Sequence, residues 1–312
     1  MRLLKRVLSE LEGEEANEAL LHAYTSRSED ADPGWSRQTF FVSNTLALQL
    51  RISSGIGGGM ETGGRVWDAA IGLSAYLHFQ WKANPTSTAD RVVLELGAGP
   101  GLPGLLLSLY GAAERVLVTD VVPATLDNLE RNIALLPPSA QARVRVGRYD
   151  WCDRAAEVPS PVDLILAADC VYEPELAEPL LSTIAAILRR NGPRATALLA
   201  AERRGGAWEY FEARMQQRIE QGELACVDLS ADVRRALRDP HCPFYCAPAT
   251  IDRLLLLQLS VPTSSSGLSS PNERKCREPQ TPRWRITASV VAGSRGASIQ
   301  LRVHLRRSDR AI

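Results

Sequence analysis

The chain has 312 residues, 45% of them hydrophobic and 23% charged, a composition typical of a globular protein that buries the core of one α/β domain. Its 36 Lys and Arg residues balance 36 Asp and Glu residues, so the net charge favours neither a nucleic acid nor a membrane surface as partner. The sequence also holds no apolar run of about 20 residues, the length that a transmembrane helix needs.

The six cysteines are scattered without a CxxC pair, which makes them a poor framework for disulfides or zinc. Cys242 and Cys246, with His241 beside them, are the grouping that most suggests a metal, but no second ligand pair accompanies them in the sequence. We therefore predict no metal site. This cysteine usage fits a reducing compartment, and we expect a cytoplasmic protein, with the nucleus as a second location.

The first 60 residues predict an N-terminal extension made of a helix and a strand. Residues 1–23 have the pattern of a short amphipathic helix, and residues 24–37, rich in Ser, Asp and Pro, that of a polar loop. Within residues 39–53, apolar side chains recur at every second position, the period of a half-buried strand: Leu46, Leu48, Leu50 and Ile52.

A helix is predicted after the glycine run at residues 55–59. Over residues 65–81 the apolar side chains step by three and four, which indicates one apolar stripe: Val66, Ala70, Leu73, Leu77 and Trp81. His78 lies on the same helix, and we expect it at the surface.

From residue 91 onward, apolar runs rich in Val, Leu and Ile alternate with helical stretches. Strands are predicted at residues 92–96, 115–120, 142–149, 163–169 and 195–202, with helices between most of them. This alternation is typical of a doubly wound α/β sheet, parallel and covered on both faces. Two further strands, at residues 224–229 and 252–260, look antiparallel and bring the sheet to seven.

The C-terminal part changes character. Residues 261–284 are rich in Ser, Pro and charged residues and indicate a linker, and the basic stretch after them could form a β-hairpin that turns at residues 293–296. We therefore divide the chain into an N-terminal extension (1–60), a central α/β domain (61–260) and a polar linker with a basic C-terminal segment (261–312).

The densest chemical signal is a glycine-rich turn between the strand at 92–96 and the next helix. It carries Glu95, Gly97, Gly99, Gly101 and Gly104, and glycines there let the backbone turn tightly and approach a bound nucleotide without a Cβ in the way. The pattern alone is ambiguous, because it also satisfies the dinucleotide fingerprint, with Asp120 ending the next strand as a residue that could hold ribose hydroxyls. A purely structural glycine turn is a third interpretation.

Several further motifs, in order and at the right spacing, resolve this ambiguity. With the glycine turn, they resemble those of methyltransferase family 16, seven-β-strand enzymes that use S-adenosylmethionine (SAM) and mostly methylate lysines of non-histone proteins. The motifs are Thr62 to Ala70, Val118 to Asp120, Asn128 with Asn132, Tyr149 to Trp151, and Asp169 to Tyr172.

The resemblance implies a role for individual residues. The cofactor would be bound by Trp67, Glu95, Gly97, Ala98, Gly99, Asp120, Trp151 and Ala168, and the methyl acceptor would meet Asp169 and Tyr172. Ordinary structural roles compete with these assignments: the tryptophans could be core residues, Asp169 a helix cap and Tyr172 packing.

The resemblance also implies SAM-dependent N-methylation of a lysine in a cytosolic protein, such as a translation factor or a chaperone-type ATPase. Alternatives are an arginine, a histidine or a small amine as acceptor, or an interaction module that binds SAM without turnover.

Overall fold

The computed structural model describes residues 25–30, 34–43, 46–53, 63–86, 89–153, 155–157 and 159–262, and the strands 284–292 and 299–307. The chain forms two compact units, residues 1–277 and residues 278–312. The predicted N-terminal helix and most of the predicted linker lie outside the described residues. None of the described helices is long and apolar enough to cross a membrane.

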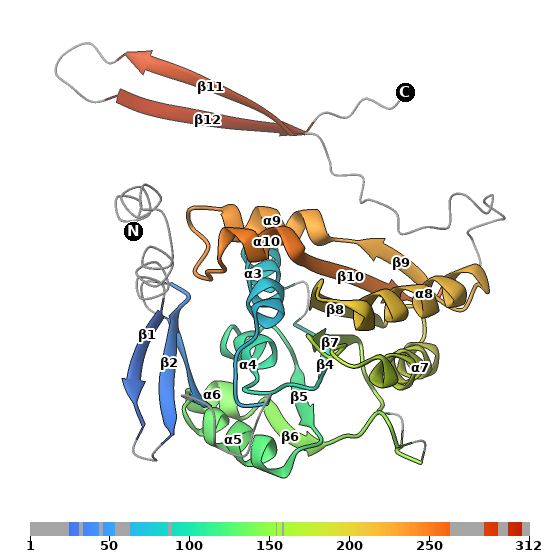
Figure 1. Cartoon of the computed structure of the whole chain (residues 1–312). Helices are drawn as coiled ribbons and strands as arrows, with labels where there is room; N and C mark the ends of the chain where they lie inside the picture. Colours follow the sequence, from blue (N-terminus) through green and yellow to red (C-terminus); the bar gives the residue numbers. More distant parts are fainter. Residues whose placement is uncertain are drawn as a thin grey trace. The chain divides into compact units, whose positions relative to one another are not determined.

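The larger unit is built on a seven-stranded sheet with the strand order β6-β5-β4-β7-β8-β10-β9 (Figure 1). The strands β4 to β8 run parallel to one another, whereas β10 is antiparallel to both of its neighbours, so β9 is again parallel to the rest. The prediction of a doubly wound α/β sheet is confirmed. The strands are β4 (Val92–Leu96), β5 (Arg115–Asp120), β6 (Val144–Arg148), β7 (Leu164–Ala168), β8 (Thr196–Glu202), β9 (Ala225–Asp228) and β10 (Leu254–Ser260).

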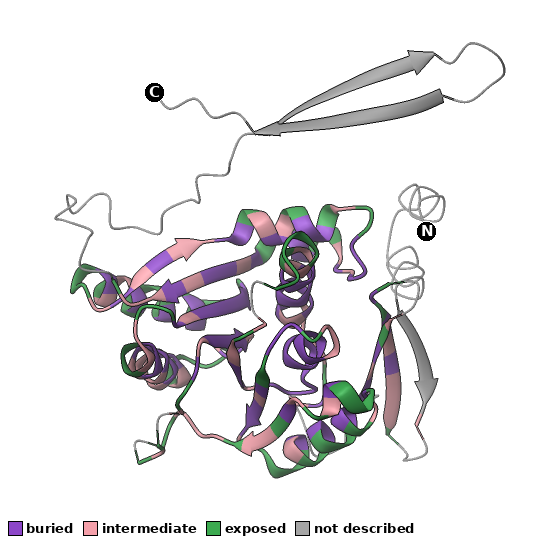
Figure 2. Cartoon of the chain, turned by 180° about the vertical axis from the view of Figure 1, so that it is seen from behind, coloured by how far each residue is buried: buried purple, intermediate pink, exposed green. Residues whose placement is uncertain are grey.

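Helices cover both faces of this sheet, which explains why its central strands are apolar throughout. Figure 1 shows α7 and α8 on the opposite side of the sheet from α3 and α4, and the buried side chains divide into two clusters accordingly. Figure 2 shows the buried residues concentrated on the strands and on the inner faces of the helices. The helices are α3 (Asp68–Ala83), α4 (Leu102–Leu109), α5 (Pro123–Ala134), α6 (Pro138–Gln141), α7 (Pro174–Asn191), α8 (Gly206–Glu220), α9 (Ser230–Arg238) and α10 (Pro248–Arg253).

The N-terminal part forms a separate antiparallel sheet in the order β1-β2-β3. The predicted strand with apolar residues at every second position is confirmed, because Leu48, Leu50 and Ile52 are buried in the third strand. The polar loop predicted at residues 24–37 is wrong: that segment forms the first strand and the start of the second. Backbone pairing, which composition does not reveal, holds these strands together: β1 (Thr25–Glu29), β2 (Trp35–Phe41) and β3 (Ala47–Ser53).

Two asparagines of α5 attach this small sheet to the glycine turn. The side chain of Asn132 accepts a hydrogen bond from the backbone N–H of Arg51 at 2.6 Å and donates one to the carbonyl of Pro100 at 2.9 Å. Asn128 donates to the carbonyl of Arg51 at 3.1 Å. The N-terminal strands therefore help to hold the loop at the carboxyl end of β4.

The expectation for His78 is wrong. Its side chain is only 2% exposed, its Nδ1 lies 2.5 Å from the hydroxyl of Tyr110, and its ring packs against Phe244. Helix α3 is covered by the sheet on one side and by α9 and the segment around Phe244 on the other. Burial lowers the pKa of His78 from 6.5 to about 4, with a smaller effect of Lys82 in the same direction.

The smaller unit contains the two antiparallel strands β11 (Trp284–Ala292) and β12 (Ile299–Arg307). They form the hairpin that the sequence suggests, and its turn lies outside the described residues.

Candidate active site

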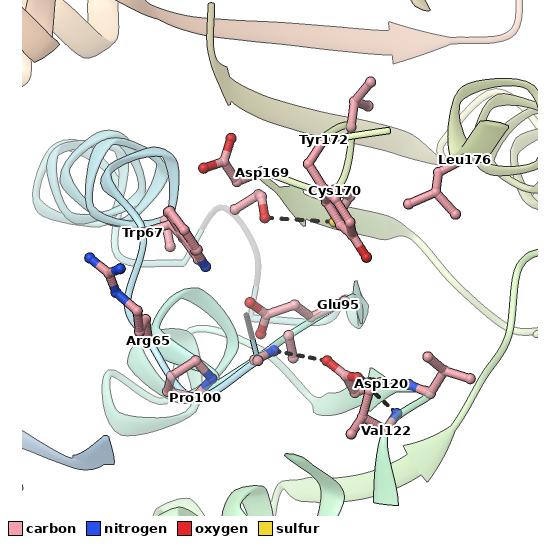
Figure 3. A pocket seen from close by; sticks show the side chains of 18 of the residues that line it. Arg65, Trp67, Glu95, Pro100, Asp120, Val122, Asp169, Cys170, Tyr172 and Leu176 are labelled. Carbon is pink, nitrogen blue, oxygen red and sulfur yellow. Dashed lines mark hydrogen bonds between the residues drawn. The ribbon is translucent and has the colours of Figure 1, made fainter. Parts of the chain in front are cut away.

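A cavity of about 530 Å³ lies where β4, β5 and β7 end, at the carboxyl edge of the sheet. This is the edge at which open α/β sheets bind ligands, and the volume is within the range of small-molecule sites. Figure 3 shows Asp169 and Tyr172 on one side of the cavity, Pro100 and Asp120 on the other, and Glu95 between them.

The glycine turn forms one wall. Gly97 and Gly99 have positive φ values of 59° and 54°, a backbone conformation that favours glycine. A Cβ at Gly97 would also lie 2.9 Å from the Sγ of Cys170 and 3.2 Å from the ring of Trp151. The absence of a Cβ at Gly97 therefore lets Cys170 and Trp151 pack closely against this wall.

Glu95 fixes the start of α4 from below this turn. Its carboxyl group is 2% exposed and accepts a hydrogen bond from the backbone N–H of Gly104 at 2.9 Å. Burial raises the pKa of Glu95 to about 8, although the bond from Gly104 acts in the opposite direction. Glu95 thus lines the cavity as a buried carboxyl group whose pKa is raised well above its ordinary value.

Asp120 ends β5 and holds the turn from the other side. One carboxylate oxygen accepts hydrogen bonds from the backbone N–H groups of Val121 at 2.8 Å and Val122 at 3.1 Å, and the other accepts one from Gly99 at 3.2 Å. A carboxylate has about four acceptor positions. Asp120 therefore has about one left for a ligand in the cavity.

Two tryptophans border the cavity in different ways. The indole N–H of Trp151 is buried and has no hydrogen-bond partner among the described residues, so it is a donor available to a ligand. Trp67 occupies the N-cap position of α3, and two guanidinium groups lie near its ring, with the Cζ atoms of Arg65 and Arg204 at 4.9 and 5.1 Å from the ring centroid. Both tryptophans are partly exposed and line the cavity.

Asp169 follows β7 and adopts a backbone conformation that is uncommon outside glycine, with φ at 57°. Its backbone N–H bonds to the carbonyl of Ala200, and its carboxylate makes an ion pair with Arg204. Burial raises the pKa of Asp169 above its ordinary value, while the charge and hydrogen bond of Arg204 act to lower it. Tyr172 lines the same side of the cavity and is 56% exposed, so it lies at the entrance.

Charged residues beyond the predicted set complete this entrance. Glu202, the last residue of β8, contacts Arg204 at 3.2 Å and Arg253 at 2.7 Å. Glu202 and Arg204 both line the cavity. The sequence carries a signal for Glu202 alone, because it ends a parallel strand at the same edge as Asp120.

The side chains and backbone groups of this cavity fit SAM. A buried carboxylate with one free acceptor position suits a ribose hydroxyl, and the unpartnered N–H of Trp151 suits an acceptor atom of the adenosine part. Gly99, which lines the cavity without a Cβ, allows a ligand close to the backbone.

Comparison with known proteins agrees. The model of a family described as "Lysine methyltransferase" matches residues 46–218, more than half of the chain. The chain belongs to this lysine methyltransferase family. The match begins inside β3, so the family region includes part of the N-terminal sheet. As a member of this SAM-dependent family of protein methyltransferases, the chain uses SAM as its methyl donor.

Its relatives within the curated proteins include enzymes named for two acceptors. EEF1A lysine methyltransferase 3 of Mus musculus is 34% identical over 173 residues, which are 54% of this methyltransferase and 69% of the relative. Protein N-lysine methyltransferase METTL21A of Mus musculus is 36% identical over 40% of this chain and 56% of its own. Histone-arginine methyltransferase METTL23 of Mus musculus is 30% identical over 47% of this chain and 56% of its own.

The structure of this methyltransferase brings all ten predicted site residues to one cavity. They are Trp67, Glu95, Gly97, Ala98, Gly99, Asp120, Trp151, Ala168, Asp169 and Tyr172. Their individual roles in binding and transfer stay predictions.

Proposed function

We propose that this methyltransferase transfers methyl groups from SAM to the amine of a lysine in a protein substrate. The observation that carries the proposal is the carboxylate of Asp169, only 10% exposed, in a cavity that Tyr172 also lines, in a chain of the lysine methyltransferase family. A carboxylate and an exposed aromatic ring on the same side of one cavity suit a side chain that arrives as a cation.

In this proposal, one side of the cavity binds the cofactor and the other side binds the methyl acceptor. Bound SAM supplies an electrophilic methyl group. Gly99, Asp120 and Trp151 hold the cofactor, which fixes the direction from which an acceptor must approach. Asp169 orients the incoming ammonium, Tyr172 guides it into the cavity, and the proton leaves to water. The remaining rate enhancement comes from alignment of the reacting atoms.

The proposed substrate is a cytosolic protein of the translation-factor or chaperone-ATPase kind. Two relatives are named as protein lysine methyltransferases, one of them for EEF1A. We assign the catalytic role to residues 61–260 and place the protein in the cytoplasm, with the nucleus as a second location.

The test is to incubate the enzyme with tritiated SAM and a lysate from cells grown without methyl donors, and to separate the amino acids of the labelled protein. We expect the label in methyllysine. Label in a dialysable product would instead indicate a small amine, and SAM binding without transfer would indicate a binding module.

Arginine is the second candidate acceptor, and a specific observation favours it. The carboxylates of Asp169 and Glu202 already hold one guanidinium, that of Arg204. Carboxylates bind a guanidinium through parallel N–H donors, so a site that already holds one guanidinium also suits the side chain of a substrate arginine. Label recovered as methylarginine would decide for this candidate.

A further inference from the structure

Arg204 occupies a position at the entrance that neither cofactor binding nor acceptor orientation explains. It lies two residues past the end of β8, and its guanidinium makes ion pairs with Asp169 and Glu202 while its Cζ lies 5.1 Å from the ring centroid of Trp67. Three groups from three segments hold it. It is therefore a positive charge fixed in place, although its side chain is 44% exposed.

Several segments contribute charged side chains to the surroundings of Arg204. Arg65 approaches Trp67 from the loop before α3, and Arg253, at the end of α10, binds Glu202. Asp68, the first residue of α3, has a pKa raised by burial and by Glu202. The charged groups in and around the entrance are thus balanced: Asp169 and Glu202 lie opposite Arg65 and Arg204 in the lining of the cavity, and Asp68 and Arg253 lie behind them.

A lysine acceptor presents a problem that this balance addresses. Its amine has a pKa of about 10.4 in water, so only about one molecule in 2,500 is neutral and nucleophilic at pH 7. Asp169 without a partner would stabilise the ammonium and lower that fraction further. A like charge nearby does the reverse and lowers the pKa of an amine by one unit or more.

We propose that Arg204 is the residue that keeps the bound acceptor amine neutral, by supplying a fixed positive charge beside Asp169. This rests on the proposed function, since it assumes a lysine acceptor at that carboxylate. Arg204 acts through the charge field and not by touching the reacting atoms, so it is a positioning residue. Because solvent screens a side chain that is 44% exposed, we take its effect as about one pKa unit, a tenfold change in the neutral fraction.

The test compares Arg204→Gln with the matched control Arg203→Gln, using a lysine peptide from the labelled substrate. Arg203→Gln removes the same charge from the neighbouring position. Arg203 pairs with Glu212 at 3.5 Å and does not line the cavity. The ammonium binds more tightly without Arg204 but does not react. At pH 7.5 we therefore expect kcat and KM of Arg204→Gln to fall together by about tenfold, with kcat/KM nearly unchanged.

The pH profile provides a second readout. The acid limb of kcat reports the amine in the bound complex, so it should move up by about one pH unit in Arg204→Gln and return in Arg204→Lys, which restores the cation. Arg203→Gln should match the wild type throughout.

Two results would overturn the inference. A KM that rises while the kcat limb stays in place would make Arg204 a plain substrate contact, and a fall in kcat/KM with a lower melting temperature would make it structural. If the wild type places its label in another amino acid or none, the proposed function fails first, and the inference fails with it.

Discussion

Replacing Asp120 tests the cofactor side of the cavity most directly. Three of the roughly four acceptor positions of its carboxylate are taken by backbone N–H groups of Val121, Val122 and Gly99. The sequence alone suggests that it accepts both ribose hydroxyls, whereas this geometry leaves room for about one. A hydrogen bond to a charged group contributes about 1.5 to 3 kcal/mol, so Asp120→Ala should weaken SAM binding by about 10- to 150-fold.

The same substitution should also affect folding. Removing the carboxylate leaves three N–H groups of the turn without their acceptor, and the loss of such bonds typically lowers the free energy of unfolding by at least about 2 kcal/mol. Asp120→Asn retains one acceptor oxygen but turns an N–H₂ donor toward other donors, so we expect it to be intermediate in stability.

Calorimetric titration with SAM, on protein shown to be folded by circular dichroism, measures the first effect and thermal unfolding the second. Asp127→Ala is the matched control, because it removes the same charge from an exposed position of α5 outside the cavity. SAM affinity within twofold of the wild type in folded Asp120→Ala would remove Asp120 from the cofactor site.

Three further predictions concern the acceptor side and the core. Asp169→Ala should lower turnover by on the order of a hundredfold, with SAM affinity changed less than threefold, and an unstable but fully active variant would refute the assignment. Tyr172→Phe should lose about tenfold in kcat, whereas full activity would assign the guiding role to the ring. The buried His78 has a folded pKa of about 4 against 6.5 unfolded, so its contribution to stability is complete above pH 6.5 and falls by about 3 kcal/mol as the pH drops toward 4. The difference in unfolding free energy between wild type and His78→Gln should therefore shrink as the pH falls through that window. The raised pKa of Glu95 gives the stability of the protein the opposite dependence on pH, but Glu95 is present in both proteins and cancels in the difference. A difference that stays constant with pH would contradict the prediction.

The large sheet can be predicted from the sequence because the residue types of each strand reflect whether its two faces are buried. A central parallel strand such as β7 is covered on both faces and therefore reads Leu-Ile-Leu-Ala-Ala. The glycine turn is predictable for a related reason, since its positive φ values restrict the residue type. These are local constraints.

The features that the sequence did not predict depend on partners far along the chain. β1 and β2 are recognisable by their mutual register and not by alternation of apolar residues. His78 is buried because α9 and Phe244, more than 150 residues away, cover its helix. Arg204 pairs with Asp169, 35 residues earlier, and nothing in its own neighbourhood distinguishes it from Arg203.

The two sides of the cavity are therefore held in different ways. On the side proposed for the cofactor, backbone N–H groups bond to Glu95 and Asp120, so we expect substitutions there to affect both the fold and SAM binding. The acceptor side consists of ion pairs between side chains from separate strands, in which one residue changes charge without moving the backbone. The relatives include enzymes named for lysine and for arginine acceptors. If Asp169 meets the acceptor, as proposed, the pairing of Asp169 and Glu202 with Arg204 is the part of the cavity where such a difference would arise, because the donor side is tied to the backbone.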